Sequence, residues 1–296
     1  MSDKKNILVT GANGQLGMEF RELAPSYPQY NFHFVSRQDL DITRQDQLLT
    51  VFSNQHFDFC INCAAYTAVD KAESDRETAM LINGAAAGFL AKICNQNKTQ
   101  LIHISTDYVF DGTACTPYTE GAKTNPINFY GESKLAGEEQ ISQHDPSAII
   151  IRTSWVYSFY GNNFVKSMIR LMGQHETIGV VNDQWGCPTY AYDLAEAIMN
   201  IVEKMGNGKR EMVIGEDNIF HFCNNARITW FDFATAIKEI IDSNCGVYPI
   251  SSSEYKTAAK RPTYSVMDTR KIKKEFGILM KDWRESLEIC IKKYGN

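Results

Sequence analysis

Tyr130 and Lys134 stand four residues apart in the segment YGESK, so both side chains project from one face if the segment is helical. A phenol beside an ammonium group is a proton donor whose pKa can be tuned. At about 4 Å and an effective dielectric near 20, the attraction between the two charges is roughly 4 kcal/mol. The pair therefore predicts acid–base chemistry, with the phenol pKa lowered from about 10 toward neutrality. The alternative interpretation is an exposed Tyr–Lys pair on a helix surface.

A glycine-rich segment near the N-terminus has the pattern of a phosphate-binding turn. An apolar run at 6–10 leads into GANGQLG at 11–17, and a helix-like stretch follows at 18–23. Strand, glycine turn and helix in this order are typical of a dinucleotide site, where helix N–H groups hold the pyrophosphate. The alternative is an ordinary glycine-rich loop. The residues of this turn that we expect to contact a cofactor are Gly11, Asn13, Gly14, Gln15, Leu16 and Gly17.

Apolar runs typical of strands alternate with helical stretches through the first half of the chain. The expected strands cover 7–10, 31–36, 59–63, 101–105, 148–153 and 177–181, and the expected helices cover 44–54, 76–96, 127–143 and 162–173. This alternation predicts an α/β fold with a doubly wound parallel sheet of the Rossmann type. Such sheets bind ligands at the carboxyl ends of their strands, where Gly11, Ala64-Ala65-Tyr66 and Ser105-Thr106 all fall.

After about residue 155 the pattern loosens. We expect a helix at 190–204, a turn-rich stretch at 206–218, a strand at 219–223, a helix at 230–242, a loop at 243–264 and a helix at 283–294. The sequence predicts a dinucleotide-binding Rossmann domain at 1–155 and a smaller, mainly substrate-binding lobe at 156–296. Segments near 176–182 and 219–223 are expected to return to the sheet.

Composition and charge fit an ordinary globular protein. The chain has 296 residues, with 44% apolar and 22% charged residues. A net charge of −5 argues against nucleic-acid binding, and the short basic run at 270–274 is interpreted as a solvated helix face. No apolar run is long enough to span a membrane, and too few residues precede Gly11 for a signal sequence. We therefore expect a cytoplasmic protein without membrane contact.

Cysteine and histidine do not form a recognisable metal-binding pattern. Cys60 and Cys63 form a lone C-x-x-C inside an expected strand, with no second pair or nearby histidine. Buried thiols are the better interpretation. His103 alternates with isoleucines in another expected strand, so we interpret it as a semi-buried residue with its hydrogen bonds satisfied.

The glycine turn, Ser105-Thr106 and the Tyr130/Lys134 pair occur in the order found in extended short-chain dehydrogenases/reductases, which the chain resembles. Within that superfamily it is most similar to dTDP-4-dehydrorhamnose reductases. The similar motifs are NCAAYTAVDKAE at 62–73, STDYVFDG at 105–112, RTSWVY at 152–157, GNNF at 161–164, NDQ at 182–184 and RP at 261–262. The resemblance covers nearly the whole chain and is most specific between Ser105 and Tyr157.

This resemblance implies reduction of the 4-keto group of dTDP-4-dehydro-L-rhamnose to dTDP-L-rhamnose, the last step of dTDP-rhamnose biosynthesis. Hydride would come from reduced nicotinamide and the proton from Tyr130. Lys134 would hold the nicotinamide ribose and lower the phenol pKa, while Thr106 would hydrogen-bond the carbonyl oxygen. The alternative for Thr106 is a hydroxyl that caps a strand end. Related 4,6-dehydratases carry a glutamate after Ser-Thr-Asp, where this chain has Tyr108, so the resemblance favours a reductase.

The resemblance also implies substrate contacts. Trp155 would stack on the sugar ring, and Arg261 would clamp the diphosphate with its planar fork. The alternatives are a buried core tryptophan and a surface arginine. The further polar residues expected in the substrate pocket are Asp107, Tyr108, Asn163, Gln184 and Thr189.

Cofactor choice can be read partly from the end of the second expected strand. An acidic residue there would favour NAD, whereas Ser36 and Arg37 suit a 2′-phosphate. We therefore expect a preference for NADPH with NADH tolerated. Asp41 and Ile42 are expected along the adenine. The other residues expected to contact the cofactor are Ala64, Ala65 and Tyr66.

Some members of the resembled family form a metal-bridged dimer through glutamates. Glu19 falls where one of these would lie, but Tyr192 occupies the place of another. We therefore expect no metal and leave a homodimer open. Two other functions also stay open. One is a non-catalytic nucleotide-binding regulatory subunit, and the other is a reductase or epimerase of a different 4-keto sugar nucleotide.

Overall fold

The computed structural model describes residues 4–206 and 218–294 and confirms the doubly wound parallel sheet. Within these residues the main sheet is six-stranded in the order β10-β5-β4-β3-β1-β2, and all of its pairs are parallel. The strands are β1 (Lys5–Thr10), β2 (Tyr30–Val35), β3 (Phe59–Asn62), β4 (Gln100–Thr106), β5 (Ile149–Thr153) and β10 (Ile219–His221). From β1 the chain adds β2 on one side and β3 on the other, which opens a ligand crevice at their carboxyl ends.

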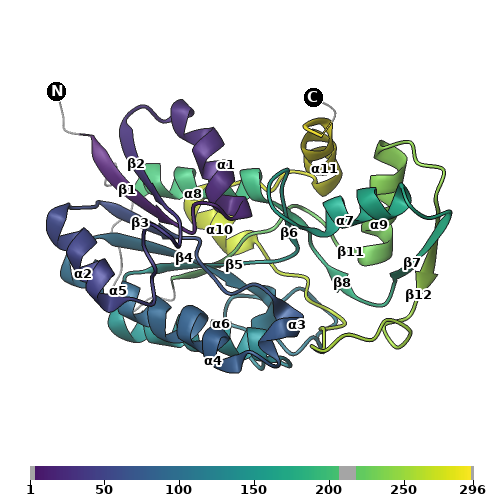
Figure 1. Cartoon of the computed structure of the whole chain (residues 1–296), viewed down its shortest axis with the longest axis horizontal. Helices are drawn as coiled ribbons and strands as arrows, with labels where there is room; N and C mark the ends of the chain where they lie inside the picture. The colour runs from purple at the N-terminus through teal and green to yellow at the C-terminus, as the bar shows by residue number, and fades with distance from the viewer. Residues whose placement is uncertain (1–3, 207–217, 295–296) are drawn as a thin grey trace.

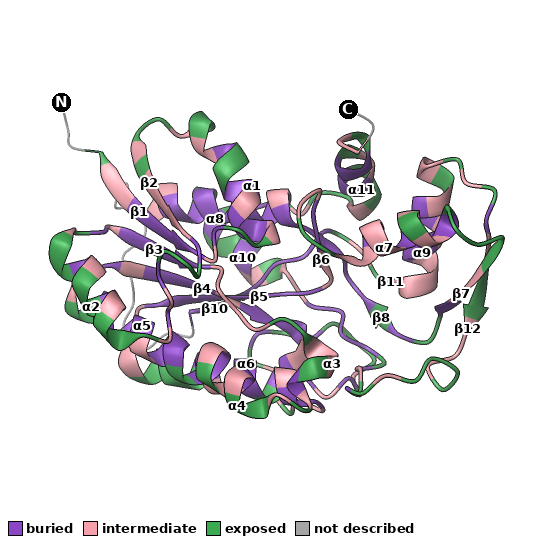
Figure 2. Ribbon diagram, in the orientation of Figure 1, coloured by how far each residue is buried: buried purple, intermediate pink, exposed green. Residues whose placement is uncertain are grey.

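Alternation of side chains along the strands creates two apolar faces. Ile7 and Val9 of β1 pack into one buried cluster, whereas Leu8 packs into the other. Because both faces are buried, the strands read as continuous apolar runs in the sequence. The helices on the first face are α1 (Gln15–Leu23), α8 (Ala191–Gly206) and α10 (Arg270–Phe276). Those on the second are α2 (Gln45–Asn54), α5 (Ala86–Gln96) and α6 (Phe129–His144). Figures 1 and 2 show the buried strands between these two layers.

Short elements lie around the carboxyl end of the sheet. These are α3 (Val69–Ala72), α4 (Arg76–Met80), the π-helical η2 (Leu81–Ala85) and the 3-10 turn η3 (Asp107–Val109), whereas η1 (Ala24–Ser26) follows α1 and leads into the start of β2. The sequence predicts one helix over 76–96, and the structure instead runs α4, η2 and α5 in succession. The π-helical turn packs against α6, which carries Tyr130 and Lys134.

The smaller lobe lies beyond the carboxyl end of the sheet (Figure 1). Its helices are α7 (Phe164–Met172), α9 (Trp230–Ile240) and α11 (Trp283–Lys292). Its paired strands are β7 (Thr177–Val181) with β12 (Gly246–Ile250), β6 (Val156–Tyr157) with β9 (Thr189–Tyr190), and β8 (Trp185–Gly186) with β11 (Ile228–Thr229). Among the described residues, no helix is long and apolar enough to cross a membrane.

The expectation that 176–182 returns to the main sheet is wrong. β7 pairs in parallel with β12, which forms inside a segment that the sequence predicts as loop. The sequence does not predict β12 as a strand, because its Tyr248 and Pro249 are exposed and its residues do not alternate between buried and exposed. Ile219–His221 pairs with β5 at the edge of the main sheet. The turn-rich stretch expected at 206–218 falls almost entirely outside the described residues, and the domain boundary at 155 stays a prediction.

Close packing of α6 generates the first testable prediction. A Cβ at Gly137 would lie 2.1 Å from the Asn83 carbonyl oxygen, whereas a Cβ at Gly121 would meet no atom within 4 Å. Gly137→Ala should therefore lower the free energy of unfolding by about 1–3 kcal/mol through overpacking. The control Gly121→Ala should stay within about 0.5 kcal/mol of the parent. Urea unfolding of both variants measures this, and equal stability of the two would contradict the packing described.

Candidate functional site

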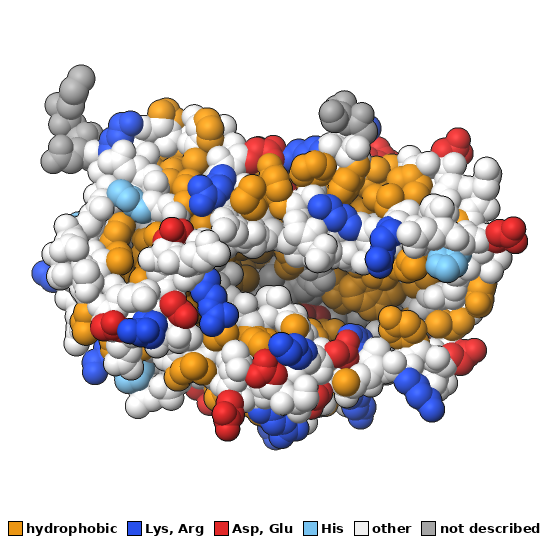
Figure 3. Space-filling view, viewed as in Figure 1, with side chains coloured by type: hydrophobic (Ala, Val, Ile, Leu, Met, Phe, Trp, Pro, Cys, Tyr) orange, Lys and Arg blue, Asp and Glu red, His pale blue; other side chains and the backbone are white. Residues whose placement is uncertain are grey.

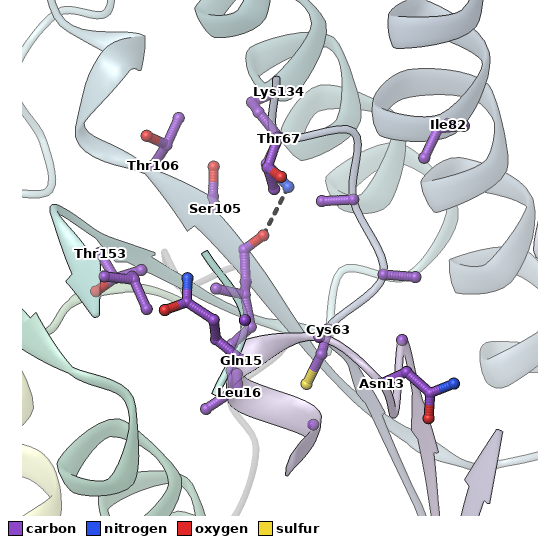
Figure 4. Close-up of a pocket in the computed structure, with 18 of the residues that line it drawn as sticks. Asn13, Gln15, Leu16, Cys63, Thr67, Ile82, Ser105, Thr106, Lys134 and Thr153 are labelled. Atoms are coloured by element: carbon purple, nitrogen blue, oxygen red, sulfur yellow. Dashed lines mark hydrogen bonds between the residues drawn. The ribbon is translucent and has the colours of Figure 1, made fainter. Parts of the chain in front are cut away.

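A cavity of about 890 Å³ runs from the glycine turn, across the carboxyl ends of the strands, to the smaller lobe. Figure 3 shows the hollow in this face of the molecule, with hydrophobic side chains gathered along its side toward the smaller lobe. Figure 4 shows Asn13 and Gln15 at one part of the cavity and Lys134, Ser105 and Thr106 at another. The cavity therefore joins the two parts of the sequence predicted to bind a cofactor and to do chemistry.

The glycine turn has the geometry of a dinucleotide cradle. Gly11 has φ of +63°, and a Cβ there would lie 2.6 Å from the backbone nitrogen of Ala64. A Cβ at Gly17 would lie 2.6 Å from Cα of Ala12, so helix α1 packs directly on the end of β1. Gly14 is the N-cap of α1, where no side chain competes for the first N–H groups of the helix. These N–H groups and the helix dipole suit a diphosphate.

At the far end of the cavity, two polar side chains end the second strand. The Ser36 hydroxyl donates to the Asp39 carboxylate at 2.7 Å, and the exposed Arg37 lies 3.5 Å from the Asp41 carboxylate. The hydrogen bonds from the Ser36 hydroxyl and the Ser36 N–H, and then the charge of Arg21, hold the pKa of Asp39 below its ordinary value. Two guanidinium groups thus lie near the position where the sequence predicts a 2′-phosphate.

Helix α6 begins at a point fixed by hydrogen bonds. The Asn128 side chain accepts from the Gly131 N–H at 2.8 Å, and Glu73 accepts from the Phe129 N–H at 2.8 Å. A Cβ at Gly131 would lie 2.2 Å from the Tyr108 carbonyl oxygen, so only glycine lets the helix start this close to η3. The capped start places Tyr130 on the first turn and Lys134 one turn later, facing the cavity.

The Tyr130 phenol keeps its proton at neutral pH. Burial raises its pKa to about 12, a hydrogen bond with the Thr106 side chain lowers it, and the charge of Asp107 raises it. This differs from the expectation of a pKa lowered by Lys134. The reason is that burial outweighs the hydrogen bond with Thr106, and the Lys134 amine bonds the Ile104 carbonyl and His103 instead. A protonated phenol is the form that a proton donor requires.

Lys134 is 1% exposed and faces β4. Its Nζ donates to the Ile104 carbonyl oxygen at 2.6 Å, the dashed line in Figure 4. Nζ also lies 3.1 Å from Nε2 of His103. Burial lowers the pKa of Lys134 to about 8, and the charge of Glu138 raises it in opposition. The Glu138 carboxylate is itself held by Arg152 at 2.6 Å. Lys134 is therefore an amine that can change charge near physiological pH.

Thr106 combines the two roles that the sequence leaves open. Its hydroxyl accepts from the Tyr108 N–H at 3.2 Å, which caps η3, and donates to the Asp107 carboxylate at 3.0 Å. The same hydroxyl lies beside the Tyr130 phenol and lines the cavity. Tyr108 packs edge-on against Tyr130, with ring centroids 5.8 Å apart. Capping thus fixes the hydroxyl at the place where a carbonyl oxygen could receive two hydrogen bonds.

Two stacked tryptophans form the wall toward the smaller lobe. Trp155 and Trp230 lie with ring centroids 3.5 Å apart and planes 10° apart, and both line the cavity. Trp155 has φ of +48°, a conformation that side chains other than glycine rarely adopt. A Cβ at Gly186 would lie 2.5 Å from the Trp155 indole, so Gly186 makes room for it. The strained backbone and the glycine together hold one face of Trp155 against Trp230.

Most of the residues expected at the site line the cavity. They are Gly11, Asn13, Gly14, Gln15, Leu16, Gly17, Ser36, Arg37, Asp41, Ile42, Ala64, Ala65, Thr106, Asp107, Tyr108, Tyr130, Lys134 and Trp155. The structure brings these side chains together, and their roles toward cofactor and substrate stay predictions.

Five of the expected residues lie outside the lining of the cavity: Tyr66, Asn163, Gln184, Thr189 and Arg261. Each has another partner. The Tyr66 hydroxyl donates to Asp75, Asn163 donates to Gln15, and Gln184 donates to Ser252. Thr189 bonds the Thr153 hydroxyl, and Arg261 forms a bidentate ion pair with Asp70 at 2.8 and 3.1 Å. Asn163 can therefore act on the site through Gln15, which does line the cavity.

Several cavity residues are not predicted from the sequence, and Trp230 is the largest of them. Trp230 opens α9, whose start is fixed by a capping box between Thr229 and Asp232. The pattern T-W-F-D carries that capping signal, but nothing in the sequence shows that the helix begins beside Trp155. Ser105, which the sequence places at the carboxyl end of a strand, also lines the cavity, and its hydroxyl donates to the Glu138 carboxylate.

Glu19, the residue considered for a metal bridge, is fully buried on α1. Its carboxylate accepts from the Ser158 hydroxyl at 2.6 Å, and burial raises its pKa to about 7. Residues 4–206 and 218–294 hold no cluster of three or more His, Cys, Asp or Glu arranged to bind a metal ion. All eight cysteines, which lie within these ranges, are free thiols. The expectation of no metal stays a prediction.

Comparison with known proteins agrees with this geometry. Residues 5–296 match the family described as RmlD substrate binding domain. A dTDP-4-dehydrorhamnose reductase of Aggregatibacter actinomycetemcomitans is 37% identical over 95% of this chain and 97% of its own length. The crystal structure of a dTDP-4-dehydrorhamnose reductase from Bacillus anthracis in complex with NADP is 38% identical. It covers 98% of this chain and 99% of its own, with a TM-score of 0.90. A dTDP-4-keto-6-deoxy-D-glucose reductase of Streptomyces niveus is 37% identical over 88% of this chain and 87% of its own.

The tryptophan stack gives a prediction that needs no ligand. Gly186→Ala should push Trp155 away from Trp230, because the new methyl group would overlap the indole. We expect the exciton-coupled circular dichroism of the stacked indoles to disappear while the protein stays folded. At Gly173 a Cβ would meet no atom closer than 3.6 Å, so Gly173→Ala is the matched control and should keep the signal. An unchanged signal in folded Gly186→Ala would show that the stack does not depend on this glycine.

Proposed function

The chain belongs to the dTDP-4-dehydrorhamnose reductase family, and we propose that it reduces the 4-keto group of dTDP-4-dehydro-L-rhamnose to give dTDP-L-rhamnose. The observation that carries this proposal is a protonated, buried phenol beside a hydroxyl and a buried amine in one cavity with a dinucleotide cradle. This combination supports carbonyl reduction better than nucleotide binding alone, because binding requires neither Tyr130 nor Thr106.

The cofactor is NADPH. A relative 38% identical to this chain has been solved with NADP, and the cavity has the features that such a molecule needs. The N–H groups that open α1 would hold the diphosphate, and Ser36 with Arg37 would hold the 2′-phosphate. Replacing Gly11 by alanine would place a Cβ in contact with the Ala64 backbone and so disrupt the turn that would hold the diphosphate. Bound NADPH supplies a hydride to the carbonyl carbon.

The residues of the chain supply the proton and hold the oxygen. As the carbonyl carbon gains the hydride, its oxygen acquires the electron pair of the former double bond and accepts the Tyr130 proton. The Thr106 hydroxyl, held by the Tyr108 N–H, would turn its one proton from Asp107 to that oxygen and so stabilise charge on it. Lys134 keeps one side bonded to Ile104 and His103, which leaves its remaining N–H for the nicotinamide ribose hydroxyls. The products are the alcohol and a phenolate that must regain a proton.

The sugar nucleotide would lie between the catalytic groups and the smaller lobe. Trp155, backed by Trp230, offers one flat apolar face toward the sugar ring. Arg261 is held by Asp70, so it would bind a diphosphate only by sharing or leaving that carboxylate. These roles rest on the resemblance of the motifs together with the positions of the side chains. A cytoplasmic location remains part of the proposal, and a homodimer stays open.

A second candidate is favoured by one relative. The Streptomyces niveus protein is named as a reductase of a different 4-keto sugar, and it is as similar to this chain as several rhamnose enzymes. The same catalytic groups would serve either substrate, because both are dTDP-linked 4-keto-6-deoxy sugars. The direction from which the ring presents its carbonyl decides the product.

Product analysis tests the proposed function. Purified protein is mixed with NADPH and enzymatically prepared dTDP-4-dehydrorhamnose, cofactor oxidation is followed by absorbance, and the product is identified by NMR. dTDP-L-rhamnose is the expected product. A talose-configured product would favour a reductase of the opposite stereochemistry. Oxidation of NADPH with dTDP-4-keto-6-deoxy-D-glucose alone would favour the second candidate, and absence of oxidation with both sugars would favour the regulatory subunit.

Tyr130→Phe should lower kcat by about 100-fold or more and leave NADPH binding intact, because the ring stays and the transferable proton is lost. The control is Tyr160→Phe, which removes an exposed hydroxyl that bonds Glu22 outside the cavity lining. Single-turnover rates isolate the chemical step. Normal single-turnover reduction by Tyr130→Phe would mean that another group donates the proton.

Arg37→Ala should reduce the preference for NADPH over NADH by about tenfold, since one charge-assisted bond to a phosphate contributes roughly 1.5 kcal/mol. The matched control is Arg44→Ala, because Arg44 is also exposed but pairs with Asp46 outside the cavity lining. The ratio of kcat/KM for the two cofactors measures the effect. A parent enzyme that prefers NADH would contradict the assignment of Ser36 and Arg37.

A further inference from the structure

A buried row of polar side chains crosses three neighbouring strands and ends at Lys134. Thr10, Asn62 and His103 are aligned partners in β1, β3 and β4. Thr10 donates to Oδ1 of Asn62 at 2.7 Å, and Nδ2 of Asn62 lies 2.9 Å from Nδ1 of His103. Nε2 of His103 then lies 3.1 Å from Nζ of Lys134. Each of the four side chains is 1% exposed.

The orientation of the Asn62 amide fixes where His103 carries its proton. The Ala64 N–H, which can only donate, lies 3.3 Å from Oδ1 of Asn62, so the oxygen must face that side. The amide NH₂ therefore faces Nδ1 of His103, which must accept. Burial and the charge of Lys134 lower the pKa of His103 well below its ordinary value, so the ring stays neutral. A neutral ring that accepts at Nδ1 carries its N–H on Nε2.

An N–H on Nε2 points at Nζ of Lys134 and needs an acceptor there. A neutral amine provides one lone pair, and its two N–H groups remain for the Ile104 carbonyl and for the cavity. A charged ammonium has no lone pair, so His103 would then have to move its proton to Nδ1 and Asn62 would have to turn. Turning Asn62 sacrifices its bond from the Ala64 N–H. The row therefore favours the neutral amine.

We propose that Asn62 and His103 act as positioning residues that set the protonation state of Lys134. Asn62 holds the N–H of His103 on Nε2, and this N–H donates to the neutral Lys134 amine. The assignment of the His103 and Lys134 protons does not depend on the proposed function. Only its consequence for catalysis, given next, rests on that function. After Tyr130 has given its proton to the substrate, a charged Lys134 can release a proton toward the phenolate. The resulting neutral amine then accepts from His103, whose proton returns to Nε2 as Asn62 turns back.

Other charges around Lys134 do not explain this preference. Glu138, on the same helix, favours the charged amine, although Arg152 of β5 largely engages its carboxylate. Asp107 of η3 acts on Tyr130. Cys63, after β3, lines the same cavity, and burial keeps its thiol protonated by raising its pKa. His103 is the group on β4 that contacts Nζ through a side chain.

The direct test uses the cofactor-free parent protein with ¹⁵N-labelled histidine and ¹³C-labelled lysine, followed by NMR on both sides of pH 8. Above the Lys134 midpoint, we expect His103 to carry its N–H on Nε2. Below it, the N–H should move to Nδ1 with the same midpoint as Lys134. An N–H on Nδ1 at every pH, or a His103 signal that ignores the Lys134 titration, would overturn the proposal. This outcome does not depend on whether the protein reduces any sugar.

A double-mutant cycle separates the tautomer from simple charge. In Asn62→Asp, every oxygen accepts, so Nδ1 of His103 can donate and Nε2 can accept from an ammonium. The proton affinity of Lys134 should rise about tenfold or more, and the alkaline limit of kcat should move upward with it. In the His103→Leu background the same substitution should change the affinity by less than about threefold. An equal rise in both backgrounds would assign the effect to charge alone. If Asn62→Asp fails to fold, the measurement on the parent protein decides.

Discussion

Burial of the Lys134 amine between α6 and β4 is the constraint on which the catalytic end of the cavity depends. Burial disfavours charge on any group, so it lowers the pKa of the amine and raises that of the Tyr130 phenol. The phenol therefore keeps its proton until a carbonyl oxygen with growing negative charge can take it. The amine, in contrast, exchanges its proton easily. One physical effect thus suits the phenol to its proposed role as proton donor and the amine to its proposed role of returning that proton.

Such a pair works only if backbone packing holds it in place, and glycines allow this packing. Gly131 lets the start of α6 pass under the Tyr108 carbonyl, and Gly137 lets the same helix touch η2. Side chains at these positions would move Tyr130 away from Thr106 and Lys134 away from β4. Gly11 and Gly17 do the same for the turn that would hold the cofactor. The positions that allow close backbone contact therefore determine the geometry more than the reactive residues do.

The sequence predicts the main sheet because its strands are buried on both faces and read as plain apolar runs. It predicts the glycine turn and the Tyr130/Lys134 pair because both are local patterns with fixed spacing. Contacts between distant segments are different. Pairing of β7 with β12, stacking of Trp155 on Trp230, and the ion pair of Arg261 with Asp70 each depend on how the lobes meet. His103 shows the same limit, since period-two alternation places it on the α6 face of β4 but does not reveal Lys134 above it.

The loop that carries Arg261 also connects the smaller lobe to the start of α6 by hydrogen bonds. The Ala259 N–H and the Arg261 side chain both bond Asp70, and the Asn128 side chain donates to the Lys260 carbonyl at 2.8 Å. Asn128 is the N-cap that fixes the first turn of α6 and hence Tyr130. In the proposed binding mode, a ligand that draws Arg261 toward its diphosphate would pull on a loop that is bonded to the start of α6. The proposed substrate contact and the placement of Tyr130 would then be coupled through three consecutive residues, Ala259, Lys260 and Arg261.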